Sequence, residues 1–262
     1  MRRDETATLI ERRVLSSDAS LLLFRSSFLA ASVRPGQFTM VRLPEAEGLL
    51  LRRPYSFCDV EPDDDTFSLL VKEVGRGSRA LARLSAGAEV QCLGPLGSTF
   101  TLPAPELHPV IVAGGVGIAP FIALTRALRA AGRDASVLLG GRTTQDLYLR
   151  EEFETFGMDV RCATEDGSFG ASGRVTELLD EALEGRAVQL YSCGPTPMLV
   201  KVAELARERG VAHQVSLERR MGCGMGCCLG CVVYTSDYVR CCTEGPVFDA
   251  KSIQWDRDPH PL

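Results

Sequence analysis

Residues 110–120 read Val-Ile-Val-Ala-Gly-Gly-Val-Gly-Ile-Ala-Pro, a short apolar run that passes into a glycine-rich turn. A helical pattern over 120–131 follows directly. Glycines let a backbone approach a pyrophosphate closely, and the N-terminus of a helix offers oriented N–H groups to it. The turn is not a full G-x-G-x-x-G fingerprint, and such a turn can also be purely structural. The stretch predicts a strand, a turn and a helix of a parallel sheet, with candidate nucleotide-binding residues Gly114, Gly115 and Gly117.

The chain beyond this unit continues the same alternation. Apolar runs and helical patterns follow one another at 136–139, 175–183, 188–192 and 196–209. Strands that are apolar throughout and alternate with helices indicate a parallel sheet buried on both faces. A second turn, Cys193-Gly194-Pro195, would lie at the same carboxyl edge, where open α/β sheets bind ligands. We therefore expect an α/β nucleotide-binding domain over residues 109–214.

The first hundred residues have a different texture, in which short apolar and β-branched runs are separated by turn residues. The expected strands are 6–15, 20–26, 37–43, 55–60, 66–74 and 89–93. Short strands at this spacing predict an antiparallel barrel. A single helix over 78–84, with Ser78 as its N-cap, is expected to interrupt them. The proline-rich segment 102–109 reads as a linker, so the barrel domain is expected to span residues 1–102.

The barrel carries two signals for phosphate and ring binding. Arg53-Pro54-Tyr55-Ser56 combines a guanidinium suited to phosphate with an aromatic ring that could stack on a flat heterocycle. Gly75-Arg76-Gly77-Ser78 precedes the expected helix, whose amides could hold the other side of a pyrophosphate. Taken singly, Arg53 reads as a solvated charge and Tyr55 as a strand aromatic. Together with the glycine turn at 114–117 they favour a dinucleotide site.

The last fifty residues are dominated by cysteine. Cys223, Cys228 and Cys231, with a more distant cysteine at 241 or 242, have the C-x4-C-x2-C...C spacing of a plant-type [2Fe-2S] site. Only Cys228 is separated from Cys223 by four residues and from Cys231 by two, so its neighbour Cys227 is the weaker candidate. Zinc remains an alternative, since it also uses C-x2-C pairs. The segment is too small to hold a core without a metal, and we expect a third domain over 215–262.

Bulk properties limit the possible partners. The 262 residues carry a formal charge of -5, which gives no basic field for nucleic acid. No apolar stretch approaches the roughly 18 residues of a spanning helix, so no membrane association is expected. The only early apolar run, 21–24, is too short for a secretory leader, so a cytoplasmic location is expected and disulfides are disfavoured.

These motifs together resemble the ferredoxin-reductase superfamily, whose members join an FAD-binding barrel to a nicotinamide-binding α/β domain. The residues that carry the resemblance are Arg53-Pro54-Tyr55-Ser56, the turn Gly94-Pro95-Leu96-Gly97 and Cys193-Gly194-Pro195. The C-terminal residues narrow the resemblance to one group within this superfamily. Ser216-Leu217-Glu218-Arg219-Arg220-Met221 before the first cysteine, and Cys242-Thr243-Glu244-Gly245-Pro246-Val247-Phe248 after the last, resemble the electron-transfer subunits of class 1B dihydroorotate dehydrogenases.

The resemblance implies a set of site residues. The flavin site would use Arg53, Pro54, Tyr55, Ser56, Leu70, Val71, Lys72, Gly77 and Ser78. The cluster ligands would be Cys223, Cys228, Cys231 and Cys242, with Cys227 and Cys241 as bystanders. Cys193, Gly194 and Pro195 would lie near the nicotinamide, with no proton transfer assigned to the thiol. NAD is favoured over NADP, although Arg142 after Gly140-Gly141 could meet a 2'-phosphate.

The resemblance also implies a function. A nicotinamide exchanges hydride and a [2Fe-2S] cluster exchanges single electrons, so FAD must lie between them. Electrons would reach the cluster from an FMN-containing catalytic subunit that oxidises dihydroorotate for pyrimidine biosynthesis, in a complex with two copies of each subunit. This chain alone would only reduce artificial acceptors with NADH.

Two alternatives remain open. One is the flavin subunit of a ferredoxin-dependent NADP oxidoreductase or sulfide dehydrogenase. The other is a zinc-stabilised interaction module that has no redox role.

Overall fold

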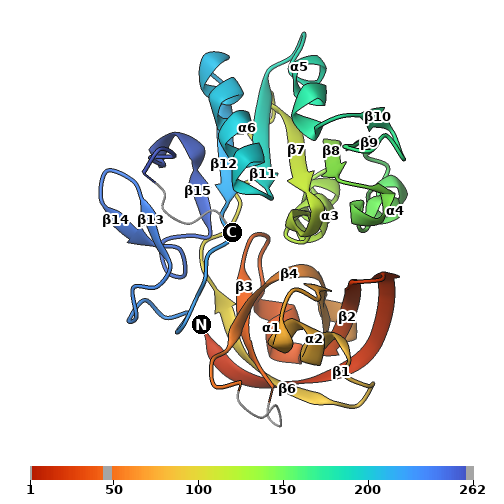
Figure 1. The fold of residues 1–262 in the computed structure, drawn as a ribbon, viewed down its shortest axis with the longest axis vertical. Coiled ribbons are helices and arrows are strands. Elements are labelled where there is room, and N and C mark those ends of the chain that lie inside the picture. Colours follow the sequence, from red (N-terminus) through yellow and green to blue (C-terminus); the bar gives the residue numbers. More distant parts are fainter. Residues whose placement is uncertain (1, 44–48, 258–262) are drawn as a thin grey trace.

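The computed structural model describes residues 2–43 and 49–257, in which an N-terminal barrel and a C-terminal sheet face each other across an interface (Figure 1). The expected fold class, a flavin-type antiparallel barrel followed by a parallel α/β domain and a small cysteine-rich region, is confirmed. Within the described ranges, no helix combines the length and the apolar character needed to cross a membrane. The last five residues of the expected third domain, 258–262, lie outside the described part.

The barrel is closed by six antiparallel strands in the order β1-β2-β5-β4-β3-β6, with β6 returning to β1. Alternate side chains point inward, as the burial of every second residue in β6 shows, and Leu22, Phe24 and Leu69 are among the side chains that fill the interior. The strands are β1 (Arg3–Ser16), β2 (Ala19–Arg25), β3 (Phe38–Arg42), β4 (Arg53–Glu61), β5 (Thr66–Lys72) and β6 (Glu89–Leu96).

Two helices accompany the barrel, α1 (Ser27–Ser32) and α2 (Arg76–Ala82), so the expectation of a single helix was wrong. α1 has only six residues, too few for a helical period to show in the sequence, and Ser26 caps it. The assignment of Ser78 as an N-cap was also wrong. Gly75 is the N-cap of α2, and Ser78 in the first turn accepts the Gly75 N–H at 3.0 Å. A serine at this position reaches back to the N–H of the N-cap residue, the opposite direction to the bond of an N-cap side chain.

The second layer is a seven-stranded sheet in the order β10-β9-β8-β7-β11-β12-β15, parallel except for β15. Its strands are β7 (His108–Gly114), β8 (Ser136–Gly141), β9 (Asp159–Thr164), β10 (Ala171–Ser172), β11 (Val188–Cys193), β12 (Ala212–Ser216) and β15 (Val247–Asp249). The three strands expected from apolar runs form its centre. The outer strands are shorter or more polar, and their apolar pattern is weaker.

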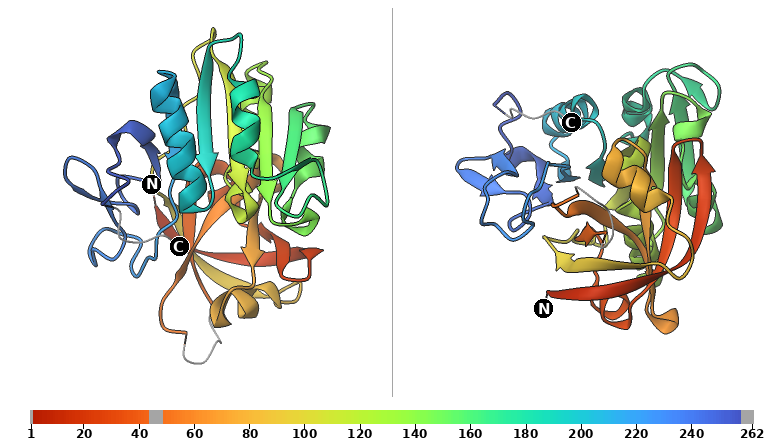
Figure 2. Two further views of the ribbon diagram at one scale, coloured as in Figure 1. Left: turned by 45° about the horizontal axis from the view of Figure 1, so that its top comes forward. Right: turned by 60° about the horizontal axis from the view of Figure 1, so that its bottom comes forward.

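Helices cover both faces of this sheet (Figure 2). On the face toward the barrel, Phe121 and Leu128 of α3 (Phe121–Ala130) pack with Ile111 of β7. On the other face, α5 (Leu179–Ala182) and α6 (Thr196–Glu208) pack on Val110 and Leu190. The sheet is therefore buried on both sides, as the sequence predicts. The helix expected over 175–183 begins as a 3-10 turn at Val175–Leu178, and a further short helix, α4 (Arg150–Thr155), follows β8.

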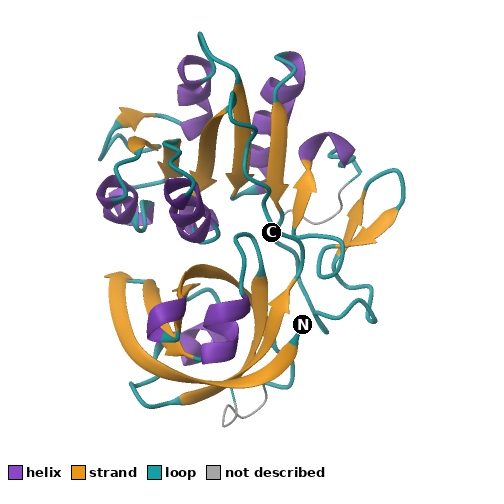
Figure 3. Cartoon of the chain, turned by 180° about the vertical axis from the view of Figure 1, so that it is seen from behind, coloured by secondary structure: helices purple, strands orange, loops and turns teal. Residues whose placement is uncertain are grey.

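The cysteine-rich region lies beside both layers rather than apart from them (Figure 3). It contributes a hairpin, β13 (Val232–Tyr234) and β14 (Tyr238–Arg240), and its strand β15 pairs with β12 at the edge of the sheet. Its buried side chains share one core with Met40 and Leu96 of the barrel and Val215 of the sheet. The region therefore shares its core with its neighbours, and the expectation that only a metal could supply one was incomplete.

One turn of the barrel makes a close contact with this region. The Ser98 hydroxyl donates to the Val247 carbonyl at 2.9 Å and accepts the Val247 N–H at 3.0 Å. Gly97 has φ +82°, and a Cβ placed on it would lie 2.5 Å from Pro246 Cδ. The two glycine-proline motifs at 94–97 and 245–246 are far apart in sequence but pack directly against each other. Gly97 must lack a side chain so that Pro246 can lie at this distance.

Gly97→Ala tests this contact. We expect it to lower the free energy of unfolding by about 3 kcal/mol, since it adds a steric overlap to the strain of a left-handed backbone. Gly87→Ala is the matched control, because Gly87 has φ +89° and nothing within 4 Å of the added Cβ. The control should lose only about 1 kcal/mol. Equal losses in urea unfolding would show that the junction tolerates the side chain.

Candidate functional site

The two phosphate signals of the barrel lie side by side. Arg53 begins β4, and its guanidinium packs directly on Gly77 in the first turn of α2, where any Cβ would overlap the Arg53 Nε atom. The Arg53 guanidinium also donates to the Leu51 carbonyl at 2.6 Å. A fixed guanidinium beside the N–H groups of a helix start is an arrangement that binds phosphate.

The rest of the predicted flavin set lies on β4 and β5. Pro54, Tyr55 and Ser56 are half-buried and pair with Met40, Thr39 and Phe38 of β3. Burial raises the pKa of Tyr55 to about 12, so its hydroxyl keeps its proton. A half-buried ring on a barrel strand can offer its face to a flat ligand.

The β5 residues of the predicted set differ in what they can offer. Leu70 and Val71 are buried, so Val71 can present mainly its backbone to a ligand. The Lys72 ammonium lies between two carboxylates, Asp146 at 3.1 Å and Asp18 at 3.5 Å. A phosphate at Lys72 would have to compete with both of them.

The two turns at the carboxyl edge of the sheet pack against each other. A Cβ on Gly114 would lie 2.8 Å from Pro195 Cδ, and a Cβ on Gly194 would lie 2.9 Å from the Gly114 nitrogen. Gly117 has no room for a side chain because the Cys193 carbonyl occupies the space. Close approach of one backbone to another therefore explains these glycines. Gly115 differs, since it has φ +54° and open space around it.

A small depression with no room for a water molecule lies beside Gly115, over the ends of β7 and β8. Gly140, Asp146 and Tyr148 contribute to its wall. Arg142 extends from the end of β8 with most of its side chain exposed, and its backbone N–H donates to Asp146 Oδ2 at 3.2 Å. Gly115 itself has no atom near the position of a Cβ, and it lies at the carboxyl ends of parallel strands, where α/β sheets bind nucleotides.

Cys193 lies beneath this edge rather than on it. Its side chain is 1% exposed and packs in the core between the barrel and the sheet. Burial is the main reason why the pKa of Cys193 is raised well above its ordinary value, against a hydrogen bond to Ser216. The thiol is therefore neutral and closed to solvent.

The four predicted cluster ligands lie in two groups. Cys223 is in hydrogen-bonding contact with Cys228 and also with the neighbouring Cys227, and Cys231 is in contact with Cys242. Within the described residues, no three acidic, histidine or cysteine side chains converge as ligands of one metal ion would. A [2Fe-2S] cluster takes two thiolates on each iron, whereas a structural zinc ion takes four around one centre. Two groups fit the first arrangement.

The loop directs amide groups at the sulfur atoms. The Met225 N–H donates to Cys223 Sγ at 3.3 Å and the Gly230 N–H to Cys228 Sγ at 3.5 Å. Burial opposes ionisation of Cys223, but the backbone N–H groups of Met225 and Cys228 and the neighbouring thiols outweigh it and lower the pKa of Cys223 to about 6. Burial and the neighbouring Cys231 raise the pKa of Cys242 to about 12. Such donors stabilise thiolates, so the loop fits an iron–sulfur cluster.

The two remaining tail cysteines differ in position. Cys241 is fully buried and its thiol donates to the Leu217 carbonyl at 3.4 Å, away from the loop. Cys227 is exposed and its thiol contacts Cys223. Cys227 is thus the spare thiol that lies nearer the predicted ligands.

The cluster loop lies against the strand that pairs with the flavin motif. A Cβ on Gly224, which has φ +70°, would lie 2.5 Å from Met40 Cγ. Met40 is itself the strand partner of Pro54. One residue of β3 thus separates the loop from the R-P-Y-S motif. Sequence reasoning missed Met40, because a methionine inside a strand carries no signal of what lies across it.

Three family models match the chain in the order of its structural parts. They are the oxidoreductase FAD-binding domain over residues 6–100, the oxidoreductase NAD-binding domain over 111–204, and the iron-sulfur cluster binding domain of dihydroorotate dehydrogenase B over 218–254. FAD, NAD and an iron–sulfur cluster are therefore the cofactors of this fold.

Solved structures agree on the fold. A chain of the NADH-dependent reduced ferredoxin-NADP oxidoreductase, studied for flavin-based electron bifurcation, superposes with a TM-score of 0.86 at 30% identity, covering 95% of this chain and 90% of that one. The ferredoxin reductase of carbazole 1,9a-dioxygenase gives a TM-score of 0.70 at 25% identity over 80% of this chain and 67% of that one.

Curated relatives match over nearly their whole length. A protein of Shouchella clausii is 37% identical over 253 residues, which cover 94% of this chain and 96% of the relative, and one of Enterococcus faecalis is 35% identical over 96% and 98%. Both are named electron transfer subunits of dihydroorotate dehydrogenase B (NAD(+)). The expected family is thus confirmed, and the chain belongs to the electron transfer subunits of dihydroorotate dehydrogenase B.

Proposed function

We propose that this chain relays electrons between NAD and the FMN of a catalytic partner that oxidises dihydroorotate, through FAD in the barrel and a [2Fe-2S] cluster in the tail. The observation that carries the proposal is the contact of Gly224 with Met40, the strand partner of Pro54. It brings the cluster loop within one residue of the flavin motif. When bound, FAD exchanges hydride with a nicotinamide and single electrons with a cluster.

The protein's own groups bind and orient these cofactors. Arg53 and the start of α2, including the N–H groups of Gly77 and Ser78, hold the flavin phosphates, with Tyr55 against the ring. Pro54, Ser56, Leu70, Val71 and Lys72 complete the flavin site. On the sheet, Gly115 and the turn that contains Gly114 and Gly117 receive the nicotinamide coenzyme beside Cys193-Gly194-Pro195. Cys223, Cys228, Cys231 and Cys242 ligate the cluster.

The partner would dock over the cluster loop. Met225, two residues after Cys223, is 48% exposed, and Leu229, directly after Cys228, is 62% exposed. Leu229 holds a left-handed backbone with φ +56°, which leucine rarely adopts. Exposed apolar side chains at the mouth of a redox centre fit a protein interface. We further propose a complex of two copies of each subunit, located in the cytoplasm.

A second candidate rests on the solved structures. The similarity to the ferredoxin-NADP oxidoreductase chain, at 30% identity and a TM-score of 0.86, favours a subunit that exchanges electrons with ferredoxin and NADP enzymes instead. The partner decides between the two. Copurification with an FMN protein that oxidises dihydroorotate supports the first candidate, and copurification with a ferredoxin-linked flavoprotein supports the second.

A serine series tests the cluster ligands. Cys228→Ser and Cys242→Ser should lose the visible iron–sulfur absorption and most of the iron, since each removes one of four thiolates. Cys227→Ser and Cys241→Ser are the matched controls, each one residue away, and should keep both. If the Cys228 or Cys242 variant kept its iron and the Cys227 or Cys241 variant lost it, the assignment of the ligands would be reversed.

The isolated subunit tests which reaction belongs to which subunit. It should reduce artificial electron acceptors with NADH, because it holds the nicotinamide and flavin sites, but it should make no orotate from dihydroorotate. Adding the catalytic subunit should establish dihydroorotate-dependent reduction of NAD. Orotate formation by this chain alone would refute the proposed relay.

Leu229→Asp tests the docking face. Aspartate tolerates a left-handed backbone better than leucine, so the chain should fold and keep its iron. A charge in an apolar contact should weaken assembly with the catalytic subunit at least tenfold in size-exclusion titrations, which corresponds to about 1.4 kcal/mol. Val14→Asp, at a 61% exposed apolar residue on β1, is the control. Unchanged assembly of the Leu229 variant would place the partner elsewhere.

A further inference from the structure

An arginine on the sheet domain forms ion pairs with two carboxylates on the barrel. Arg126 of α3 donates from Nε to Asp59 Oδ1 at 3.0 Å and from its terminal nitrogen to Asp59 Oδ2 at 2.6 Å. The same guanidinium forms an ion pair with Glu61 and lies 5.3 Å from the centre of the Phe156 ring. A bidentate guanidinium–carboxylate pair fixes direction as well as distance. The contact is therefore a rigid clamp between the domains.

The two elements that it joins are those that carry the cofactor motifs. α3 begins at Phe121, directly after the glycine turn at 114–120. Asp59 lies on β4, three residues beyond Ser56 of the flavin motif. Because a helix and a strand are stiff over such short lengths, the position of Arg126 against Asp59 sets the position of one motif against the other.

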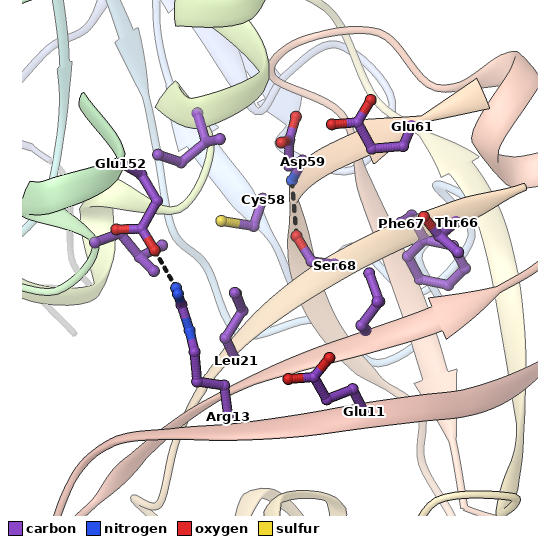
Figure 4. Close-up of a pocket in the computed structure, with 13 residues that line it drawn as sticks. Glu11, Arg13, Leu21, Cys58, Asp59, Glu61, Thr66, Phe67, Ser68 and Glu152 are labelled. Carbon is purple, nitrogen blue, oxygen red and sulfur yellow. Dashed lines mark hydrogen bonds and ion pairs between the residues drawn. The ribbon is translucent and has the colours of Figure 1, made fainter. Parts of the chain in front are cut away.

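Packing and charge both hold the domains on this side of the interface. A cavity of about 320 Å³ lies next to the clamp, walled by Cys58 and Asp59 from the barrel and by Ile122 and Leu149 from the sheet domain (Figure 4). A second ion pair across the cavity joins Arg13 of β1 to Glu152 of α4. Neither β1 nor α4 carries a predicted cofactor residue. Cys58, Ile122 and Leu149 are buried in one apolar cluster that spans both domains, so the Arg126 clamp adds a fixed direction to a contact that apolar packing also makes.

We propose that Arg126 is a positioning residue for hydride transfer between the nicotinamide and the flavin, an inference that rests on the proposed function. In that step one hydride, two electrons with one hydrogen nucleus, leaves NADH for the oxidised flavin and yields NAD and anionic reduced flavin. The reacting atoms must come within about 3–3.5 Å, and a misplacement of about 1 Å can cost a hundredfold in rate. Arg126 secures that approach through Asp59, without touching either cofactor.

The test uses the full-length protein with its cofactors and stopped-flow reduction of the flavin by NADH. Arg126→Met should slow flavin reduction at saturating NADH at least tenfold, change the isotope effect of deuterated NADH, and alter the apparent dissociation constant less than threefold. Arg126→Lys keeps the charge but not the bidentate geometry, so it should recover part of the rate. Arg13→Met is the matched control, since it also breaks an interdomain ion pair, and should stay within twofold of wild type.

A second readout does not depend on activity. Residual dipolar couplings should report one common alignment for the barrel and the sheet domain in wild type and Arg13→Met, and two in Arg126→Met. If Arg126→Met does not fold, Asp59→Asn, which leaves the Glu61 partner, replaces it in both measurements. Wild-type rate, isotope effect and alignment in the folded variant would overturn the proposal, as would equal slowing by Arg13→Met. If NADH does not reduce the flavin of the wild-type protein, the proposed function is refuted instead. The alignments of the two domains would still show whether Arg126 holds them in one orientation.

Discussion

The contact between the barrel turn at 94–98 and Gly245-Pro246-Val247 is the constraint on which the arrangement of all three parts depends. Ser98 exchanges two hydrogen bonds with Val247, and Gly97 leaves room for Pro246. Val247 also opens β15, the strand that extends the sheet next to β12. A three-residue segment is thus anchored to the barrel by side-chain hydrogen bonds and to the sheet by backbone pairing. Cys242, the fourth predicted cluster ligand, precedes this segment by three residues, so the double anchoring holds Cys242 close to the barrel turn.

Several motif glycines are required by the protein rather than by a ligand. Gly114, Gly117 and Gly194 let two turns of the sheet touch, Gly97 admits Pro246, and Gly77 admits the Arg53 side chain. A nucleotide motif of this kind therefore has two physical functions. It shapes the backbone that faces the ligand, and it packs the turns so tightly that their N–H groups keep a fixed direction. Preorganised donors bind an anion without a further ordering cost, which is why both functions coincide at one turn.

Much of this fold could be predicted from the sequence, because its central elements obey simple periods. The barrel strands alternate, the inner sheet strands are apolar throughout, and the cysteine spacing is specific. The elements that could not be predicted depend on contacts between distant residues. β15 has three residues and exists because β12 offers a free edge. Ser78 and Ser26 look alike in sequence, yet only Ser26 caps a helix. Arg126 and Asp59 are 67 residues apart, and each alone reads as a solvated charge.

The contacts between the barrel and the rest of the chain differ in character. The tail contact at Ser98 and Val247 is tight backbone packing, which tolerates little displacement. Between the barrel and the sheet domain, an apolar cluster that includes Cys58 and Phe121 spans the interface, and Arg126, Arg13 and Lys72 form ion pairs across it. The Arg126 pair is partly exposed, so ionic strength can weaken it. Under the proposed function, the distance between flavin and cluster therefore rests on packing, whereas the approach of the nicotinamide to the flavin rests on packing and on charge.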